Sequence, residues 1–434
     1  MEDMMKEQNA AVNEAAEYLD QIPKFSKEKH TVETVREMLK ILGISQEDMK
    51  IVHIAGTNGK GQAALYIAQI LKEAGISCGA FLSPHLIRET ERIQVDGEEI
   101  SQECLAQLMQ KNQQGASCLF DAYTKTAMDY FEQKGVQVAV LETGLGGRLD
   151  PTTRYASKIN ILTRIGYDHM NYLGKTMMEI AKEKAAIINQ NASVFTISQP
   201  QEAMEVITQA AEQKHAELIV VRGEDIQEEG NGLIKTFDFI LQGQQVQAQI
   251  AALTDVQVQN AVLAANAAYA LNQFGFSIST EQVQRGLKNA VIPARQQIVM
   301  DDDVEVMIDG GHNEDAFGAL EQTVRHRYAG QKPVFLIAMM KDKDPQKLYE
   351  LIGGLQSEVV VTQVDEERGK NIIDMSEELL ERDAHSLMVK EIAEAYFVAK
   401  KMAKNSRTSL VVCGSMYLAG EILKLLEKEG IYQS

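Results

Sequence analysis

The chain has 434 residues, enough for two or three domains, and its 45% hydrophobic and 24% charged residues are typical of a globular protein. Its formal net charge of −19 argues against nucleic acid or an anionic membrane as a main partner, because both are polyanions. No stretch is long and apolar enough to span a membrane, and the polar N-terminus is unlike a signal peptide, so we expect a cytoplasmic protein.

A phosphate-binding loop is predicted near residue 56, after a region up to about residue 42 that is expected to be mostly helical. Residues 51–55 are apolar and β-branched, which predicts a buried strand. Gly56, Gly59 and Gly61 follow, with Lys60 among them, and a helical pattern begins at Ala63. Glycine lets backbone N–H groups approach an anion, while the helix N-terminus and the lysine add positive charge. The alternative is a glycine-rich turn without a ligand.

Two further polar loops follow predicted strands. Residues 77–82 predict a short strand that leads into a loop with His85, and residues 136–142 predict a strand that ends in the carboxylate of Glu142. A second glycine loop with Arg148 comes next. A carboxylate at a strand end beside a phosphate loop suits magnesium, and an arginine among glycines suits phosphate or carboxylate. The alternatives are a surface histidine and a solvated glutamate that caps a turn.

The chain up to about residue 290 offers fewer signals. A fourth strand is predicted at residues 158–163 and leads to Asp168 and His169. The charges of the following helix, Lys184 among them, are interpreted mainly as a solvated face. Residues 193–250 alternate short apolar runs with turns, and residues 258–274 predict a helix that Asn260 interrupts with a polar side chain.

A second α/β domain is predicted after the boundary at Pro293 and Arg295. Strands are expected at residues 304–309, 334–339, 359–362 and 408–413, with helices between them. The predicted class is therefore α/β, with an N-terminal P-loop-type ATPase domain at residues 1–293 that has a mostly parallel sheet. A smaller, Rossmann-like α/β domain is expected at residues 294–434.

These segments together resemble the folylpolyglutamate synthase and dihydrofolate synthase family, the folate branch of the Mur-ligase-like ATP-dependent amide ligases. The resemblance rests on HIAGTNGKG at residues 53–61, SPHL at 83–86, ETGLGGRLD at 142–150, the pair Asp168-His169, and DGGHN at 309–313. The segments occur in the order typical of that family and cover nearly the whole chain.

The resemblance implies a defined reaction. ATP phosphorylates the carboxylate of a folate or of dihydropteroate, and the α-amine of L-glutamate attacks the acyl phosphate to give an amide, ADP and phosphate. Two Mg²⁺ sites are implied, a monovalent cation is compatible with the pattern, and the family is usually monomeric. The N-terminal domain would bind ATP and the folate, and the C-terminal domain would complete the glutamate ligase.

The resemblance also implies roles for individual residues. Lys60, Lys184, Asp309 and His312 are the expected catalytic residues. Mg²⁺ would be held by Glu142, His169 and Lys184, the last if it is carbamylated, with Gln62 as the least suited ligand. The folate is expected to contact Phe81, Ser83, Pro84, His85 and Arg148. ATP is expected to contact Gly56, Thr57, Asn58, Gly59, Lys60, Gly61, Gln62, Asn260, Arg295 and Asp309. Simpler interpretations are an unmodified surface lysine for Lys184 and a helix-cap neighbour for His312.

Gln62 is the main departure from the family pattern, which has a magnesium-binding serine or threonine at this position. Losing one oriented metal ligand typically costs about 10–100-fold in metal affinity or activity. Milder departures are Pro151, Ala186, Ala294 and the segment that begins at Asp365. Two further hypotheses follow: a folate- or nucleotide-binding paralogue with weak or no ligase activity, and a related ligase with another carboxylate acceptor.

Overall fold

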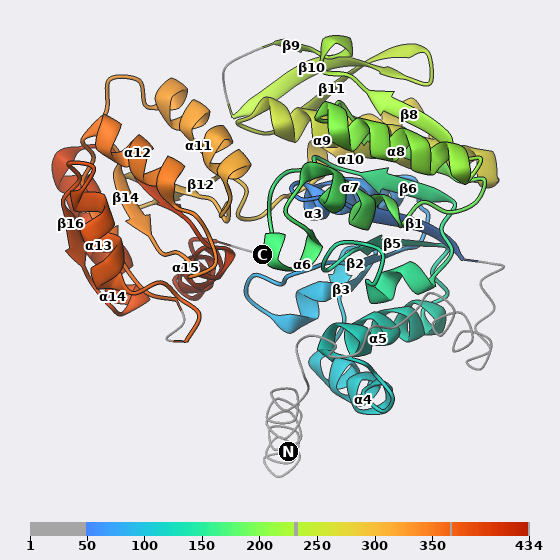
Figure 1. The fold of residues 1–434 in the computed structure, drawn as a ribbon, viewed down its shortest axis with the longest axis horizontal. Coiled ribbons are helices and arrows are strands. Elements are labelled where there is room, and N and C mark those ends of the chain that lie inside the picture. The colour runs from blue at the N-terminus through green and yellow to red at the C-terminus, as the bar shows by residue number, and fades with distance from the viewer. Residues whose placement is uncertain (1–48, 230–232, 365–366, 433–434) are drawn as a thin grey trace. The chain divides into compact units, whose positions relative to one another are not determined.

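The computed structural model describes residues 49–229, 233–364 and 367–432 (Figure 1). The helix expected before residue 42 lies outside these residues, as do Asp365 and Glu366. The described chain forms two compact units. The first extends to Ala251 and includes Gln257–Ala290, and the second comprises Ala252–Val256 and the chain from Val291 onward.

The first unit is built on a sheet that is mostly parallel. Its described strands are β1 (Lys50–Ala55), β2 (Cys78–Phe81), β3 (Ile93–Val95), β4 (Glu98–Glu99), β5 (Val138–Glu142), β6 (Ile159–Leu162), β7 (Ser193–Ile197) and β8 (Glu217–Val221). They lie in the order β4-β3-β2-β5-β1-β6-β7-β8. Neighbouring strands pair in parallel along β2-β5-β1-β6-β7-β8. Strands β3 and β4 extend the β2 edge of the sheet as an antiparallel hairpin.

Strand β1 occupies a central place in this sheet, because it pairs with β5 on one side and with β6 on the other. Its residues from Ile51 to Ala55 are buried, as expected for a strand covered on both faces. The carboxyl ends of parallel strands meet at one edge of a sheet. The loops that follow β1, β5 and β6 are therefore neighbours.

Helices cover this sheet. The described helices are α3 (Lys60–Glu73), α4 (Gln102–Asn112), α5 (Leu119–Gln133), α6 (Met170–Leu173), α7 (Met177–Ala185), α8 (Gln201–Gln213), α9 (Asp255–Tyr269) and α10 (Thr280–Asn289). Short 3₁₀ turns are η1 (Glu89–Arg92), η2 (Pro151–Arg154), η3 (Gly223–Asp225) and η4 (Ala270–Phe274). Helices α4 and α5 pack side by side, as do α7 and α8 (Figure 1). Helix α3 packs on α10 and against β1, β2 and β5.

Two apolar clusters hold these layers together. One joins α4 and α5 to β1, β2 and β5 and includes Ile51, Phe81, Leu105, Tyr123, Phe131 and Leu141. The other joins α7 and α8 to β6 and β7 and includes Leu162, Ile180, Ile188, Val194 and Ile207. Because burial of apolar area is the main stabilising contribution to folding, these clusters fix the sheet edge where the polar loops lie.

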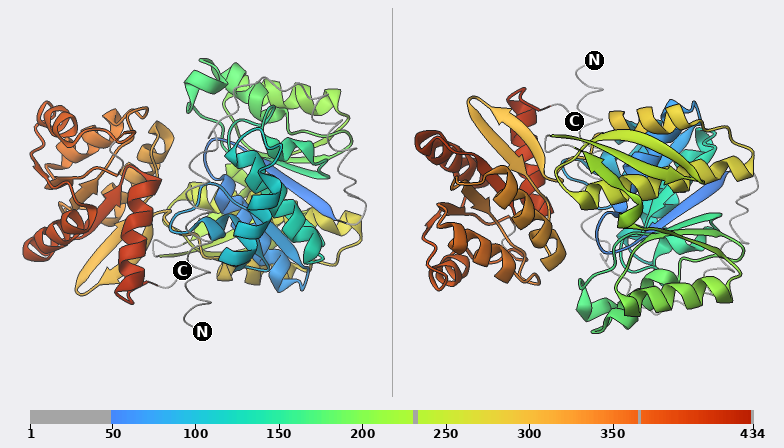
Figure 2. Two further views of the ribbon diagram at one scale, coloured as in Figure 1. Left: turned by 90° about the horizontal axis from the view of Figure 1, so that it is seen from below. Right: turned by 90° about the horizontal axis from the view of Figure 1, so that it is seen from above.

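A small antiparallel sheet forms a further layer of the first unit. Its strands are β9 (Gln227–Glu229), β10 (Ile234–Leu241) and β11 (Gln244–Ala251), and β11 contacts α10. Figure 2 shows these yellow-green strands as a separate layer. Along β11 buried and exposed residues alternate, which is the pattern of a sheet with one solvated face.

The second unit is a smaller α/β structure. Its strands are β12 (Gln297–Asp301), β13 (Val304–Ile308), β14 (Val334–Ile337), β15 (Val359–Val361), β16 (Ser386–Met388) and β17 (Leu410–Cys413), in the order β12-β13-β17-β14-β15-β16. Only the β12–β13 pair among these described strands is antiparallel. The helices are α11 (Glu314–Arg327), α12 (Gln346–Leu355), α13 (Ile372–Leu380), α14 (Ile392–Ser406) and α15 (Met416–Lys428).

The predicted class is confirmed: the described units are both α/β, and the first has a mostly parallel sheet. Helix α3 begins at Lys60, earlier than the predicted Ala63. Gly59, in a left-handed conformation, is its N-cap residue. The predicted helix at residues 258–274 is instead α9 followed by η4. In the part of the chain that the structure covers, no helix has the length and apolar character needed to cross a membrane.

Candidate active site

The loop between β1 and α3 requires glycine at two positions. Gly59 is the N-cap residue of α3 with φ 92°, and no side chain caps this helix. Gly56 has φ +153°, and a Cβ built on it would lie 1.8 Å from Thr163 Oγ1. The N-terminal end of a 14-residue helix is thus left uncovered by side-chain caps, next to Lys60. Such an end attracts anions, which fits a phosphate group.

The loop is anchored to the segment that follows β6. The N–H groups of Thr57 and Asn58 donate to the carbonyl oxygen of Arg164 at 2.8 and 3.2 Å. The Thr57 hydroxyl bonds to Gly166 twice: it donates to the carbonyl oxygen and accepts from the N–H group, both at 3.0 Å. The neighbouring Asp168 and His169 are therefore carried on a segment that is fixed to the phosphate loop.

Lys184 is directed at this loop from α7. Its Nζ donates to the carbonyl oxygen of Gly56 at 2.7 Å, and the residue is only 4% exposed. Burial, and secondarily the charge of Lys60, lower the pKa of Lys184 to about 7. The interpretation of Lys184 as part of a solvated helix face is therefore wrong. It shares the buried face of α7 with Ile180 and Ala181.

Glu142 lies beside the start of α3. It ends β5, which pairs with β1 on the side opposite β6. It is buried at the end of β5, and its Oε2 accepts the N–H group of Ser83 at 2.9 Å. A Cβ built on Gly61 would lie 3.4 Å from the same oxygen. The carboxylate thus lies beside the first turn of α3 and connects it to the Ser83 loop.

His169 is more open. It takes a left-handed conformation with φ 50°, its side chain is 40% exposed, and its Nε2 lies 3.9 Å from Asp168 Oδ2. Among residues 49–229, 233–364 and 367–432, no three His, Cys, Asp or Glu side chains form a ready-made metal cluster. Mg²⁺ commonly binds one or two carboxylates together with substrate phosphates and water, so the buried oxygen of Glu142 beside the phosphate loop fits this ion.

The Ser83 loop is built by two side chains of η1. Glu91 accepts the N–H groups of Leu86, Ile87 and Arg88 at 2.7, 2.8 and 2.6 Å. Arg92 Nε donates to His85 Nδ1 at 2.8 Å. Burial and the Arg92 charge lower the pKa of His85 to about 4, so the ring is neutral and carries its proton on Nε2. His85 is half-buried and held in place, not a free surface residue.

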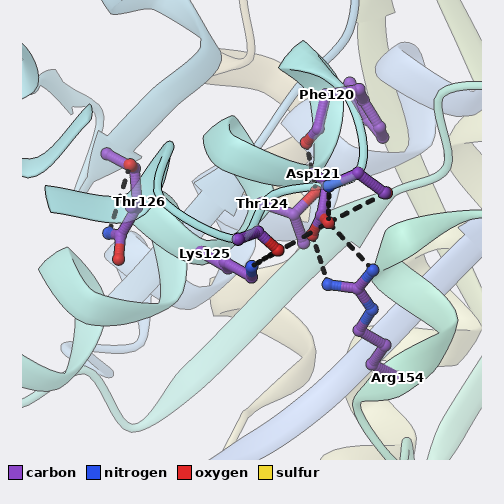
Figure 3. A network of polar contacts seen from close by, with 9 residues as sticks. Phe120, Asp121, Thr124, Lys125, Thr126 and Arg154 are labelled. Carbon is purple, nitrogen blue, oxygen red and sulfur yellow. Dashed lines mark hydrogen bonds and ion pairs between the residues drawn. The ribbon is translucent and has the colours of Figure 1, made fainter. Parts of the chain in front are cut away.

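The aromatic ring expected to face a folate, Phe81, is fully buried. Its ring centroid lies 5.3 Å from that of the half-buried Phe120, on α5. Neither Phe120 nor its neighbour Asp121 was among the predicted site residues. The Asp121 carboxylate forms a buried ion pair with Arg154. Figure 3 shows Lys125 and Arg154 pointing toward Asp121. Burial would raise the pKa of Asp121, but the bond to Arg154 outweighs it and lowers the pKa.

Hydrogen bonds of Asp150 and Thr152 hold the second glycine loop in place. Asp150 accepts the N–H groups of Gly144 and Leu145 at 2.8 and 2.9 Å, and Thr152 Oγ1 lies 2.8 Å from His53 Nε2 on β1. Burial lowers the pKa of His53 to about 3, so this histidine is a neutral structural link. Arg148, at the tip of the loop, is 51% exposed and pairs with Glu183 at 2.9 Å.

Gln62 and Asn260 meet although they are far apart in sequence. Asn260 Nδ2 donates to Gln62 Oε1 at 2.6 Å, and both residues are buried. The Gln62 amide oxygen, expected to be a poor magnesium ligand, thus already accepts a hydrogen bond from Asn260. This contact joins α3 to α9 at the phosphate loop.

A second cluster of predicted residues lies within the C-terminal unit. Asp309 follows β13, is buried, and accepts the N–H group of Gly311 at 3.1 Å. Burial raises the pKa of Asp309, although the charge of Arg295 acts in the opposite direction. Gly310 donates its N–H group to Ala294, and His312 Nδ1 lies 3.2 Å from the Gly310 carbonyl oxygen. The structure thus brings Arg295, Asp309 and His312 together.

Comparisons with known proteins agree with this arrangement. The family model "Mur ligase middle domain" matches residues 54–268, and "Dihydrofolate synthetase, C-terminal domain" matches residues 294–425. The Bacillus subtilis dihydrofolate synthase/folylpolyglutamate synthase is 31% identical over 415 residues, which cover 91% of this chain and 94% of that protein. The Escherichia coli protein of the same name is 28% identical over 390 residues, covering 89% of each chain.

A solved structure shows the same likeness in three dimensions. The folylpolyglutamate synthase of Mycobacterium tuberculosis, complexed with ADP and AMPPCP, matches with a TM-score of 0.85 and 26% sequence identity. The match covers 96% of this chain and 98% of that one.

Proposed function

Because the chain belongs to the family of folylpolyglutamate synthases and dihydrofolate synthases, we propose that it is an ATP-dependent ligase that joins L-glutamate to the carboxylate of a folate or of dihydropteroate. The carboxylate oxygen attacks the γ-phosphorus of ATP and ADP leaves. The amine nitrogen of glutamate then attacks the acyl carbon, and phosphate leaves as the amide forms. The observation that carries this proposal is the uncapped glycine loop with Lys60, flanked by Lys184 and Glu142.

In this proposal, the β- and γ-phosphates bind at the N-terminal end of α3. Residues Gly56 to Gly61 supply backbone N–H groups and Lys60 supplies charge, which lowers the energy of the negative charge that develops during phosphoryl transfer. From the C-terminal unit, Arg295 and Asp309 would contact the nucleotide, and His312 would act near the phosphates or the incoming glutamate. Asp309 and His312 follow β13, and the charge of Arg295 acts on Asp309, which supports a shared role.

Glu142 and His169 are proposed to hold Mg²⁺. This ion would neutralise charge on the phosphoryl oxygens. For Lys184 we propose carbamylation, in which the neutral amine attacks CO₂, a C–N bond forms and a proton is released. The pKa of about 7 supports this step, because a fraction of the buried amine is then unprotonated at neutral pH. The product is an anion and would serve as a further magnesium ligand.

The folate is proposed to bind near the Ser83 loop. His85 offers an Nε2–H donor, Arg148 an exposed cation, and Ser83 and Pro84 shape the loop that Glu91 holds. Phe81 would contribute indirectly, by packing under the half-buried ring of Phe120. The choice of acceptor, the monomeric state and the cytoplasmic location stay predictions.

The decisive experiment measures ATP-dependent incorporation of labelled L-glutamate, with dihydropteroate and tetrahydrofolate offered separately and magnesium present. Product with either acceptor supports the ligase and identifies the acceptor. Phosphate release without amide formation would indicate a different carboxylate acceptor. ATP binding without turnover would favour the binding paralogue. The Lys60→Met variant serves as the control that removes the phosphate-loop charge.

A further inference from the structure

The first turn of α3 carries a side chain that reaches across to another helix. Gln62 Oε1 accepts a hydrogen bond from Asn260 Nδ2 at 2.6 Å, and the two residues are only 8% and 1% exposed. Buried hydrogen bonds of this kind fix side-chain orientation, because breaking them leaves a polar group without a partner. Gln62 therefore determines how the Asn260 amide is turned.

The Asn260 amide lies directly against the phosphate loop. A Cβ built on Gly59 would lie 2.5 Å from Asn260 Nδ2 and 2.7 Å from Asn260 Oδ1. With Nδ2 donating to Gln62, no described residue forms a hydrogen bond with Oδ1, although this atom is buried. A buried acceptor without a donor costs about 1–3 kcal/mol, so this oxygen suits a partner that arrives with a ligand.

The chemistry of that partner follows from the oxygen itself. An amide oxygen repels phosphate oxygens and accepts only a donor or a cation. A triphosphate brings both to such a loop, as a divalent cation with its water shell. Glu142 Oε2, 3.4 Å from a Cβ built on Gly61, supplies an anionic oxygen beside the same turn of the loop.

We propose that Gln62 is a positioning residue, which holds Asn260 so that Asn260 Oδ1 faces the hydrated cation of a bound nucleotide. Gln62 itself is then not a metal ligand: its oxygen is used by Asn260. This inference rests on the proposed nucleotide-binding function. It also explains why a glutamine can occupy this position, since the oxygen lost with a hydroxyl is supplied from α9 instead.

The test measures the affinity of a non-hydrolysable ATP analogue by calorimetry, with magnesium and with EDTA. Gln62→Met keeps the length of the side chain but removes the acceptor. We expect its affinity in magnesium to fall by about 10-fold or more, the size typical for loss of a partner that orients a ligand. The affinity in EDTA should stay unchanged, which a merely structural defect of the loop would not produce.

Control variants isolate the pair. Gln69→Met changes the same residue type on the same helix, where Gln69 bonds only to Glu73 among the described residues, and should bind the analogue like the wild type. Asn260→Ala should lose as much affinity in magnesium as Gln62→Met. The double variant should lose no more than Asn260→Ala alone, within about twofold, because the two residues act as one unit.

The outcomes are distinguishable. Wild-type affinity of Gln62→Met in magnesium, or additive losses in the double variant, would overturn the inference and leave the proposed function intact. So would Gln62→Ser binding more tightly with magnesium, since a hydroxyl ligand would then be better than the amide pair. A wild-type protein that binds no analogue would overturn the proposed function and this inference together. Gln62→Ser and Asn260→Ala test the same claim should Gln62→Met not fold.

Discussion

Lys184 Nζ lies 2.7 Å from the carbonyl oxygen of Gly56, so a buried lysine of α7 is bonded directly to the phosphate loop. A charged amine at this depth is unfavourable, and its pKa falls to about 7. The same burial that disfavours the charge leaves a nucleophilic amine at neutral pH. This single contact supports both a structural and a chemical role for Lys184.

The chemical role predicts dependence on CO₂. Lys184→Met should reduce ligase activity by at least about 10-fold, because it removes a proposed magnesium ligand. Lys182→Met, on the exposed face of the same helix, should keep activity. The measurement is glutamate incorporation in CO₂-free buffer with and without added bicarbonate, together with the carbamate signal from labelled CO₂. Wild-type activity of Lys184→Met, or a carbamate signal that survives in it, would contradict the role.

The burial of Lys184 also predicts how stability varies with pH. Its pKa is about 7 in the folded protein against the ordinary 10.5, so between these values the unfolded chain binds a proton that the folded chain lacks. Stability should therefore rise with pH through this window. Below about pH 7 the folded protein should bear the full cost of burying the charged amine. In urea unfolding in CO₂-free buffer, the free energy of unfolding of the wild type should rise with pH relative to that of Lys184→Met. A difference independent of pH would show that the amine is not buried.

Gly59→Ala should abolish nucleotide binding. The position has φ +92°, and the added methyl would lie 2.5 Å from Asn260. A left-handed alanine alone costs about 1–2 kcal/mol. Gly75→Ala is the matched control, because Gly75 also has a positive φ of +69° but nothing lies within 4 Å of an added Cβ. Both variants should be destabilised, and calorimetry with the ATP analogue should show lost affinity in Gly59→Ala alone. Equal affinity in the two would argue against the loop as the phosphate site.

Asp121→Ala should destabilise the first unit by about 3–5 kcal/mol, because it leaves the Arg154 guanidinium buried without its partner. The exposed pair between Arg285 and Glu73 offers a control in the same unit: Arg285→Ala should cost less than about 1 kcal/mol. Thermal unfolding compares the two. Similar small effects would mean that the Asp121–Arg154 pair is accessible to water in solution.

Much of the fold could be predicted from local patterns. The apolar, β-branched runs correctly predict β1, β5, β6, β13, β14, β15 and β17, since a strand buried on both faces consists almost entirely of such residues. The β10–β11 hairpin was not predicted, because the glutamines of β11 conceal an alternation of buried and exposed positions. The short strands β12 and β16 lie at the edges of their sheet and carry weaker apolar signals.

The candidate site could be predicted only in part. A glycine-rich loop can be recognised from a short stretch of sequence, because its backbone conformations exclude other residues. The pairs Gln62–Asn260 and Asp121–Arg154 join residues 198 and 33 positions apart, and no local periodicity encodes such contacts. The charge pattern of α7 predicted a mainly solvated face, because only the tertiary packing shows that Lys184 is buried. The family resemblance, in contrast, did imply Lys184 as a site residue.

The closeness of Gly56 and Thr163 constrains which substitutions the phosphate loop can accept. A Cβ on Gly56 would lie 1.8 Å from Thr163 Oγ1, and the φ of +153° is itself restricted to glycine. Replacing Thr163 by alanine would remove the hydroxyl, but the Cβ and backbone carbon of residue 163 would still lie 3.0 and 3.2 Å from the added Cβ, and the backbone restriction would stay. Neutral drift at residue 163 therefore cannot open residue 56 to substitution, and a mutagenesis library that randomises both positions should return diversity at 163 and glycine at 56.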